Sequence, residues 1–411
     1  MNNNIKKNIL WNTIGSLINA FTSLFFLIAV TRINGVKIAG IFSFAFSLAC
    51  FFQVIGTYSG RSYQVTENNK EVKDSDYVTS RYITCSLMML VTLIYVLFKS
   101  YSSFKVSLIF ILVSYKLVEA FAEVLYGILQ KNDYLDKVGK SLLLKGIFGT
   151  LGLVLIDAIT NNLILASLSL ILINILFVLF YDLKNLKSCK IEKGKFNYKI
   201  FRYGFYAFCY AFLTFYLVQA PKLAIDNYLS STKQGVFGVI AMPATFMALC
   251  SMFIVHPYLN KLTKLYNDKN LKDFNKLFRK LVYFLLGIGV FVVIAAYFLG
   301  IPVLELVYSI KLKKYLYSFL VIICGSIFYS LSILFQNALT VFRKTGIQLV
   351  IYLIDSGLTL FLSNYLTKHH GIFGASLSYT VSMLTLAILY VIIYIYENSK
   401  IKKGLNYGKE E

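Results

Sequence analysis

Long apolar runs separated by short polar segments follow one another along the whole 411-residue chain. Most runs reach the roughly 18 residues that a helix needs to cross a hydrocarbon core about 30 Å thick. They are too long for the strands of an outer-membrane barrel, which alternate over roughly ten residues each. The pattern therefore predicts an all-α polytopic membrane protein with about 12 transmembrane helices. We expect these helices at about residues 9–31, 39–58, 82–99, 105–129, 141–159, 163–183, 204–226, 236–257, 280–300, 316–341, 346–366 and 373–396.

The expected helices repeat along the chain in their arrangement. The first three have counterparts in the seventh to ninth, and the long polar segments 59–81 and 260–279 occupy matching places. Within residues 260–279, apolar side chains at near-helical spacing among lysines predict an amphipathic helix lying on the inner leaflet. Transporters built from such repeats commonly bind their substrate between them, near the middle of the membrane. We therefore expect two six-helix lobes around a central cavity.

The expected lobes are joined by a strongly basic segment. We assign residues 1–183 to the N-terminal lobe, 184–203 to a cytoplasmic bridge, and 204–411 to the C-terminal lobe with a short basic tail. Residues 184–202 carry seven Lys or Arg and one carboxylate, Glu192. When Lys and Arg are sorted by alternate loops, 29 lie on the side of the N-terminus, nine on the other, and three within helices. This imbalance predicts that both termini are cytoplasmic.

Composition agrees with a membrane protein. Hydrophobic residues make up 58% of the chain, charged residues 15%, and the mean hydropathy is +0.68; a soluble protein has roughly 25% charged residues. The net charge of +22 is explained by topology signals and contact with membrane lipids, so no nucleic acid is expected. The six cysteines form no CxxC pair, and the adjacent His369 and His370 are expected in a short external turn, where they make a poor metal site. We expect no metal site and no cofactor, and no catalytic constellation indicates an enzyme.

Ionisable side chains within the expected helices call for a partner or a wet cavity. Lys116, Glu119, Glu123, Tyr126 and Gln130 step by three or four residues and so share one helix face. Lys116 and Glu119 can pair with each other, which leaves Glu123 without a local partner. The face is expected to point into the bundle, as a structural ion-pair network or as the wall of a cavity.

Two further positions, Lys222 and Asp355, allow a structural and a functional interpretation. Lys222 follows the helix-kinking Pro221, with Asp226 four residues later; it can snorkel to the headgroups or line the cavity and attract an anion. Asp355 is alone in its helix and is either hydrogen-bonded or a titrating coupling residue.

Lys145 and Asp157 lie near helix ends. Long or polar side chains at that depth commonly reach the headgroups, so snorkelling is the default expectation for both.

Three stretches resemble a known family: WNTIGSLINAFTSLFFLIAVTRINGVKIAGIFSFAFS from the first helix onward, GRSYQVTE after the second, and APKLAID in the seventh. They are similar to Wzx-type polysaccharide flippases of the MATE-like multidrug/oligosaccharidyl-lipid/polysaccharide (MOP) exporter superfamily, and the resemblance runs along nearly the whole chain. It implies two lobes around a V-shaped cavity. It also implies movement of undecaprenyl-diphosphate-linked oligosaccharide repeat units from the cytoplasmic to the outer leaflet of the bacterial inner membrane, for O-antigen or capsule.

The resemblance also implies roles for particular residues. Arg61, Tyr63, Gln64 and Thr66 match the family pattern R-x-Y-Q-V-T, and Glu67 stands where an Asp is expected. Cations lining the cavity are implied to hold the diphosphate; the candidates are Lys116, Lys222, Arg61 and Arg32. Candidates for coupling to a proton or sodium gradient are Glu119, Glu123, Asp226 and Asp355.

The implied partners are the polyprenyl-diphosphate-linked oligosaccharide, membrane lipids, and the polysaccharide polymerase and chain-length machinery. Two alternative functions stay open. One is a MATE-like exporter of small molecules; a lysine in the cavity favours an anionic lipid head over cationic drugs. The other is a membrane glycosyltransferase or polymerase of the same pathway; such enzymes usually have a sizeable external domain, which this pattern does not predict.

Overall fold

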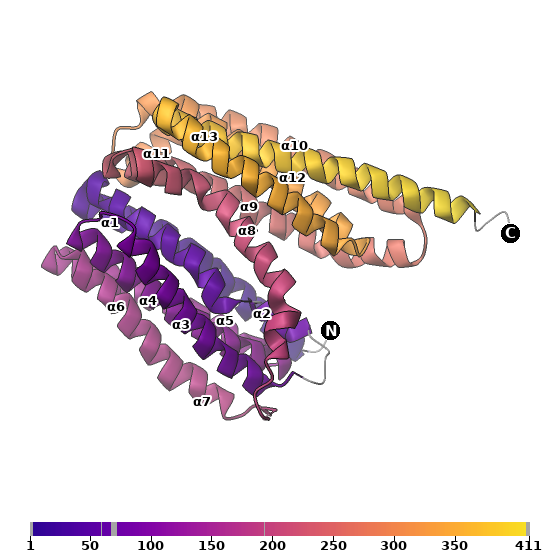
Figure 1. Ribbon diagram of the computed structural model, residues 1–411, viewed down its shortest axis with the longest axis horizontal. Coiled ribbons are helices and arrows are strands. Elements are labelled where there is room, and N and C mark those ends of the chain that lie inside the picture. Colours follow the sequence, from indigo (N-terminus) through magenta and orange to yellow (C-terminus); the bar gives the residue numbers. More distant parts are fainter. Residues whose placement is uncertain (1–2, 59, 67–71, 193, 408–411) are drawn as a thin grey trace. The chain divides into compact units, whose positions relative to one another are not determined.

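The computed structural model describes residues 3–58, 60–66, 72–192 and 194–407, and helices dominate throughout this part of the chain (Figure 1). No strand occurs among the described residues. The α-helices are α1 Asn3–Thr57, α2 Gly60–Thr66, α3 Asp74–Leu97, α4 Ser103–Lys131, α5 Leu135–Thr160, α6 Leu163–Phe177, α7 Leu183–Leu186, α8 Lys199–Tyr228, α9 Ser231–Asn267, α10 Leu271–Ala295, α11 Ile301–Tyr308, α12 Leu316–Val341 and α13 Thr345–Tyr407. The π-helical turns Val178–Asp182 and Ala296–Gly300 join α6 to α7 and α10 to α11, and a short 3-10 turn, Lys313–Tyr315, precedes α12.

Two of these helices each contain two membrane crossings. α1 bends at Gly35 (φ 78°, ψ 169°) and α13 bends at Gly371 (φ 60°, ψ −136°). Positive φ values of this kind are readily adopted only by glycine. We count each arm of α1 and α13 as one span, and we count α6 with α7, and α10 with α11, as one span each. The described residues then form twelve membrane-length helices. The predicted all-α polytopic class is confirmed.

The polar segment 260–279 differs from its prediction. α9 continues to Asn267 and α10 begins at Leu271, with Lys269 in the left-handed region (φ 56°) between them. The prediction of one surface amphipathic helix over residues 260–279 is therefore wrong. Its apolar side chains are buried in the protein, because α10 packs against α9 and α12; Phe274, for example, is 0% exposed.

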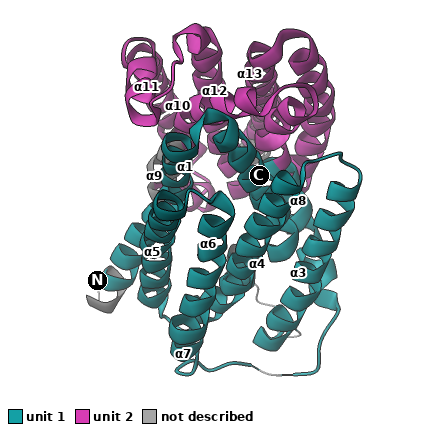
Figure 2. Ribbon diagram, turned by 90° about the vertical axis from the view of Figure 1, so that its left-hand side faces the viewer, with its two compact units in different colours: residues 1–215 teal, residues 216–411 magenta. Residues whose placement is uncertain are grey.

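Contacts divide the chain into two compact units, unit 1 (Met1–Phe215) and unit 2 (Tyr216–Glu411) (Figure 2). The boundary falls inside α8, later than residue 204, where the sequence pattern places the start of the second lobe. Aromatic packing accounts for this difference. The ring of Phe208 in the first half of α8 stacks on Tyr58 at 4.8 Å, which joins that half of the helix to unit 1.

The basic bridge before α8 lies along the beginning of α3. The backbone N–H of Ser75 donates to the carbonyl of Glu192 at 3.1 Å, and the N–H of Glu192 donates to Asp74 Oδ2 at 3.3 Å. Further along, the N–H of Asn197 donates to Asp76 Oδ1 at 3.1 Å. The bridge is thus held by the carboxylates of α3. Its exposed lysines are Lys184, Lys187, Lys190, Lys195 and Lys199.

In unit 1, α1 and α5 approach closely because glycines face the contact. A Cβ at Gly15 would lie 2.0 Å from the carbonyl oxygen of Gly139, and a Cβ at Gly139 would lie 2.2 Å from the carbonyl oxygen of Trp11. Small residues at such positions let membrane helices pack backbone against backbone. This contact brings the N-terminal arm of α1, which includes Asn19, against α5.

Gly139→Ala should therefore lower the melting temperature of the purified protein in detergent. Overpacking of this kind costs about 1–3 kcal/mol, and the clashing atoms are backbone atoms that cannot rotate away. Gly287→Ala in α10 is the matched control, because nothing lies within 4 Å of its Cβ position. Equal melting temperatures for the two variants would contradict this account of the α1–α5 contact.

Candidate functional site

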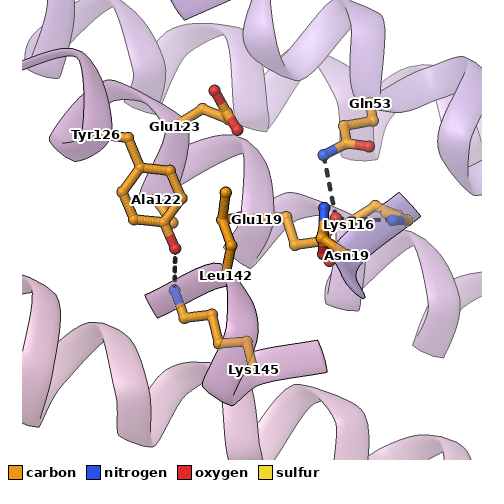
Figure 3. A pocket seen from close by; sticks show the side chains of 9 residues that line it. All are labelled: Asn19, Gln53, Lys116, Glu119, Ala122, Glu123, Tyr126, Leu142 and Lys145. Atoms are coloured by element: carbon orange, nitrogen blue, oxygen red, sulfur yellow. Dashed lines mark hydrogen bonds and ion pairs between the residues drawn. The ribbon is translucent and has the colours of Figure 1, made fainter. Parts of the chain in front are cut away.

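Unit 1 contains a cavity of about 250 Å³ with a largely polar and charged wall (Figure 3). The wall is formed by α1, α4 and α5, and it is lined by Asn19, Gln53, Lys116, Glu119, Ala122, Glu123, Tyr126, Leu142 and Lys145. Ionisable groups among membrane-spanning helices are costly unless they are paired or hydrated. We therefore treat this cavity as the candidate functional site.

α4 supplies most of the polar wall. Lys116, Glu119, Glu123 and Tyr126 all line the cavity, as their spacing of three or four residues along a helix indicates. Gln130, the fifth residue of the same stripe, is partly buried and is not among the lining residues. The stripe thus faces the interior of unit 1 over about three helical turns.

Lys116 is fixed within this wall by several neighbours. Its Nζ lies 2.7 Å from Glu119 Oε2, and Gln53 Nε2 donates to the same oxygen at 3.4 Å (Figure 3). The ammonium also lies 4.9 Å from the ring centroids of both Phe46 and Tyr115. A cation held between a carboxylate and aromatic faces gains both ion-pair and cation–π stabilisation.

Glu123, for which the sequence offers no local partner, faces Arg61 on the short helix α2. Arg61 Nε lies 3.7 Å from Glu123 Oε2, and the two side chains are 23% and 29% exposed. This pair is longer and more accessible than the Lys116–Glu119 pair. Among the described residues, nothing accepts a hydrogen bond from the buried Nη1 of Arg61.

The motif residue Gln64 holds α2 in place. Its side chain is completely buried, and Nε2 donates to the carbonyl of Val124 in α4 at 3.2 Å. Gly127 leaves room for this contact, because a Cβ there would lie 2.2 Å from Gln64 Oε1. Anchoring α2 on α4 in this way positions Arg61 beside the cavity wall.

The other two motif residues have supporting places. Tyr63 packs, partly buried, against the hydrophobic core of unit 1. Thr66 is exposed, and its hydroxyl donates to the carbonyl of Tyr63 at 3.4 Å. Neither side chain lines the cavity.

Lys145 does not snorkel, contrary to the prediction from its depth. Its Nζ donates to the hydroxyl of Tyr126 at 2.8 Å (Figure 3). It also donates to Asp182 Oδ2 at 2.6 Å. The Tyr126 hydroxyl also contacts Ser141 Oγ at 2.9 Å. The prediction was wrong because the partner carboxylate comes from another helix. Asp182 is completely buried at the end of the π-helical turn that follows α6.

Asp157 is also buried, with 0% of its surface exposed, so the snorkelling prediction is wrong here too. One carboxylate oxygen, Oδ2, accepts a hydrogen bond from Asn34 Nδ2, one residue before the bend at Gly35. Asp157 does not line the cavity. Its hydrogen bond instead joins the bend of α1 to the end of α5.

The remaining candidates do not line this cavity. Arg32 is exposed near the bend of α1, and Lys222 and Asp226 are partly buried on the part of α8 that belongs to unit 2. Asp355 in α13 is completely buried and accepts a hydrogen bond at 2.8 Å from the hydroxyl of Thr385. Among the described residues, no group of three or more His, Cys, Asp and Glu could hold a metal ion.

Comparison with known proteins gives one related sequence and several related folds. No protein-family model matches the chain. The capsular polysaccharide biosynthesis protein CapF of Staphylococcus aureus is 26% identical over 400 residues, which cover 94% of this chain and 98% of that protein. The sequence similarity thus extends over nearly the full length of both chains.

Two solved structures share the fold. An inward-facing multidrug resistance MATE family transporter of the MOP superfamily has a TM-score of 0.69 at 12% identity, covering 96% of this chain and 99% of that one. The lipid II flippase MurJ in an inward closed conformation also has a TM-score of 0.69, at 15% identity, covering 96% of this chain and 90% of that one. The predicted resemblance is confirmed.

Proposed function

We propose that this multi-pass membrane protein, whose fold is that of the MOP superfamily, is a flippase for undecaprenyl-diphosphate-linked oligosaccharide repeat units. It would move them from the cytoplasmic to the outer leaflet of the bacterial inner membrane, for synthesis of capsule or O-antigen. The observation that carries the proposal is the charged cavity of unit 1, with Lys116 in its wall and Arg61 beside it. The full-length similarity to a capsular polysaccharide biosynthesis protein supports it.

The chemistry of the cargo explains why such a cavity is needed. The polyprenyl tail is soluble in the bilayer, but the diphosphate and its sugars cannot cross hydrocarbon without losing their hydration. Cationic side chains and polar groups can replace that hydration, because charge-assisted hydrogen bonds to phosphate oxygens are strong. We assign this task first to Lys116 and Arg61. Lys222 and Arg32 stay proposed contacts for the same head group.

The transport cycle is also part of the proposal. Both termini would lie in the cytoplasm, and the two lobes would give the cavity access to each side in turn. Coupling to a proton or sodium gradient would involve carboxylates among the helices. Those proposed are Glu119, Glu123, Asp226 and Asp355.

Deleting the gene tests the proposal directly. We expect lipid-linked repeat units to accumulate in the inner leaflet, surface polysaccharide to be lost, and a plasmid copy to restore it. A failure of repeat-unit synthesis or of polymerisation would instead leave no such inner-leaflet pool. In proteoliposomes, the purified protein should translocate undecaprenyl-diphosphate-linked sugar. A deletion strain that keeps its surface glycan and has no second flippase would overturn the proposal.

A further inference from the structure

The cations at the cavity are each matched by a carboxylate. The three ion pairs are Lys116–Glu119, Lys145–Asp182 and Arg61–Glu123. An anion that enters the cavity therefore meets balanced charge. To bind a cation there it must compete with a carboxylate that the protein itself supplies.

The pairs differ in how easily such an exchange can occur. The side chains of Lys145 and Asp182 are 6% and 0% exposed, and Asp182 does not line the cavity. Glu119 and Glu123 do line it, with side chains 17% and 29% exposed. Glu123 also has the longer contact, 3.7 Å. The carboxylates open to exchange are therefore Glu119 and, more readily, Glu123.

The two exchangeable carboxylates are placed side by side on α4. They are four residues apart, which is about 6 Å along a helix axis and on the same face. Two linked phosphoryl groups can present oxygens to two neighbouring cations at once. The buried Nη1 of Arg61, which has no hydrogen-bond acceptor among the described residues, adds a donor for one of those oxygens.

We propose that Glu119 and Glu123 are internal counter-ions that occupy the anion positions on Lys116 and Arg61 while the cavity is empty, and that their return to these cations expels the diphosphate. This inference rests on the proposed function and concerns how the same site releases its cargo. A site that holds its cargo too tightly cannot turn over, so transport needs binding weak enough to leave. The pairs also spare the empty cavity the cost of unpaired cations in the membrane.

Glu123→Gln removes one counter-ion and gives the sharpest test. The purified variant should bind pyrophosphate roughly two- to fivefold more tightly than the wild type, since the ligand no longer competes with a partly exposed ion-pair partner. Its translocation of undecaprenyl-diphosphate-linked sugar should nevertheless be slower, because release becomes limiting. If Glu123 had only a structural role, its substitution would lower both the pyrophosphate affinity and the translocation rate, or change neither.

Asp157→Asn is the matched control. It changes another carboxylate of unit 1 to its amide, but Asp157 lies outside the cavity wall and bonds to Asn34, so pyrophosphate affinity should stay at the wild-type value. Glu119→Gln should act like Glu123→Gln, but it leaves Lys116 buried without its partner. If it does not fold, Glu123→Gln, whose partner is partly exposed, still decides the question.

Two failures can be told apart. A wild-type protein that binds neither pyrophosphate nor the lipid diphosphate would overturn the proposed function together with this inference. A wild type that binds and transports, with a Glu123→Gln variant whose affinity is unchanged or weaker, would overturn the counter-ion role alone.

Discussion

Arg61→Gln should slow translocation of the lipid-linked repeat unit in proteoliposomes by roughly 10- to 100-fold, the equivalent of losing one hydrogen-bonded contact to a charged group. The protein should still fold. The Arg61–Glu123 pair is long and partly exposed, and pairs of that kind contribute little to stability. Pyrophosphate affinity should fall, whereas it should rise in Glu123→Gln. If substituting the two partners of one ion pair shifts the pyrophosphate affinity in opposite directions, the pair has a role in binding and not only in structure.

Arg279→Gln in α10 serves as the control for the same chemical change. Arg279 is exposed in unit 2, and its Nε donates at 3.4 Å to the carbonyl of Asn275 in its own helix. Transport by this variant should equal that of the wild type. Arg61→Lys should be intermediate, because it keeps the charge but loses the planar fork that binds two phosphate oxygens. Wild-type transport by Arg61→Gln would remove Arg61 from the binding site.

Much of this site can be predicted from the sequence, because the residues concerned lie on a single helix. Spacing along one helix places Lys116, Glu119, Glu123 and Tyr126 on one face, and hydropathy shows that the face must be sheltered. Both properties are contained within a single stretch of chain. For the same reason the Lys116–Glu119 pair, three residues apart, could be anticipated from the sequence.

The partners supplied by other helices could not be predicted in this way. Arg61 approaches Glu123 only because Gln64 fastens α2 to α4, and Gly127 makes that contact possible. Neither α2 nor its contact with α4 follows from hydropathy, because α2 is a short helix between two polar segments. The motif residues were recognisable, but their packing was not.

Position along a helix was a misleading guide to Lys145 and Asp157. A residue near a helix end can reach the headgroups, yet it stays inside when a neighbouring helix offers a partner. Asn34 does so for Asp157, next to a glycine bend. For Lys145 the partner is Asp182, which follows a π-helical turn. An extra residue in a helical turn shifts the register, so periodicity alone could not place this carboxylate.

Asp182→Asn should strongly destabilise unit 1, by about 3–5 kcal/mol, because breaking a buried ion pair leaves an uncompensated charge. Lys145 is also hydrogen-bonded to Tyr126, which contacts Ser141, so the loss would disturb a network that joins α4, α5 and the turn after α6. We expect a much lower melting temperature in detergent and less folded protein in size-exclusion chromatography. The transport rate per folded molecule should fall by a smaller factor than the yield of folded protein, since Asp182 does not line the cavity.

Removing both charges tests whether the ion pair is the cause. Asp182→Leu combined with Lys145→Met should recover most of the lost stability, because apolar side chains of similar size can replace a buried pair at little net cost. The double variant should therefore be destabilised by less than the sum of its two single substitutions, as is common for residues in direct contact. If the double variant melts as low as Asp182→Asn or lower, the loss comes from packing around the π-helical turn, and the charge argument fails.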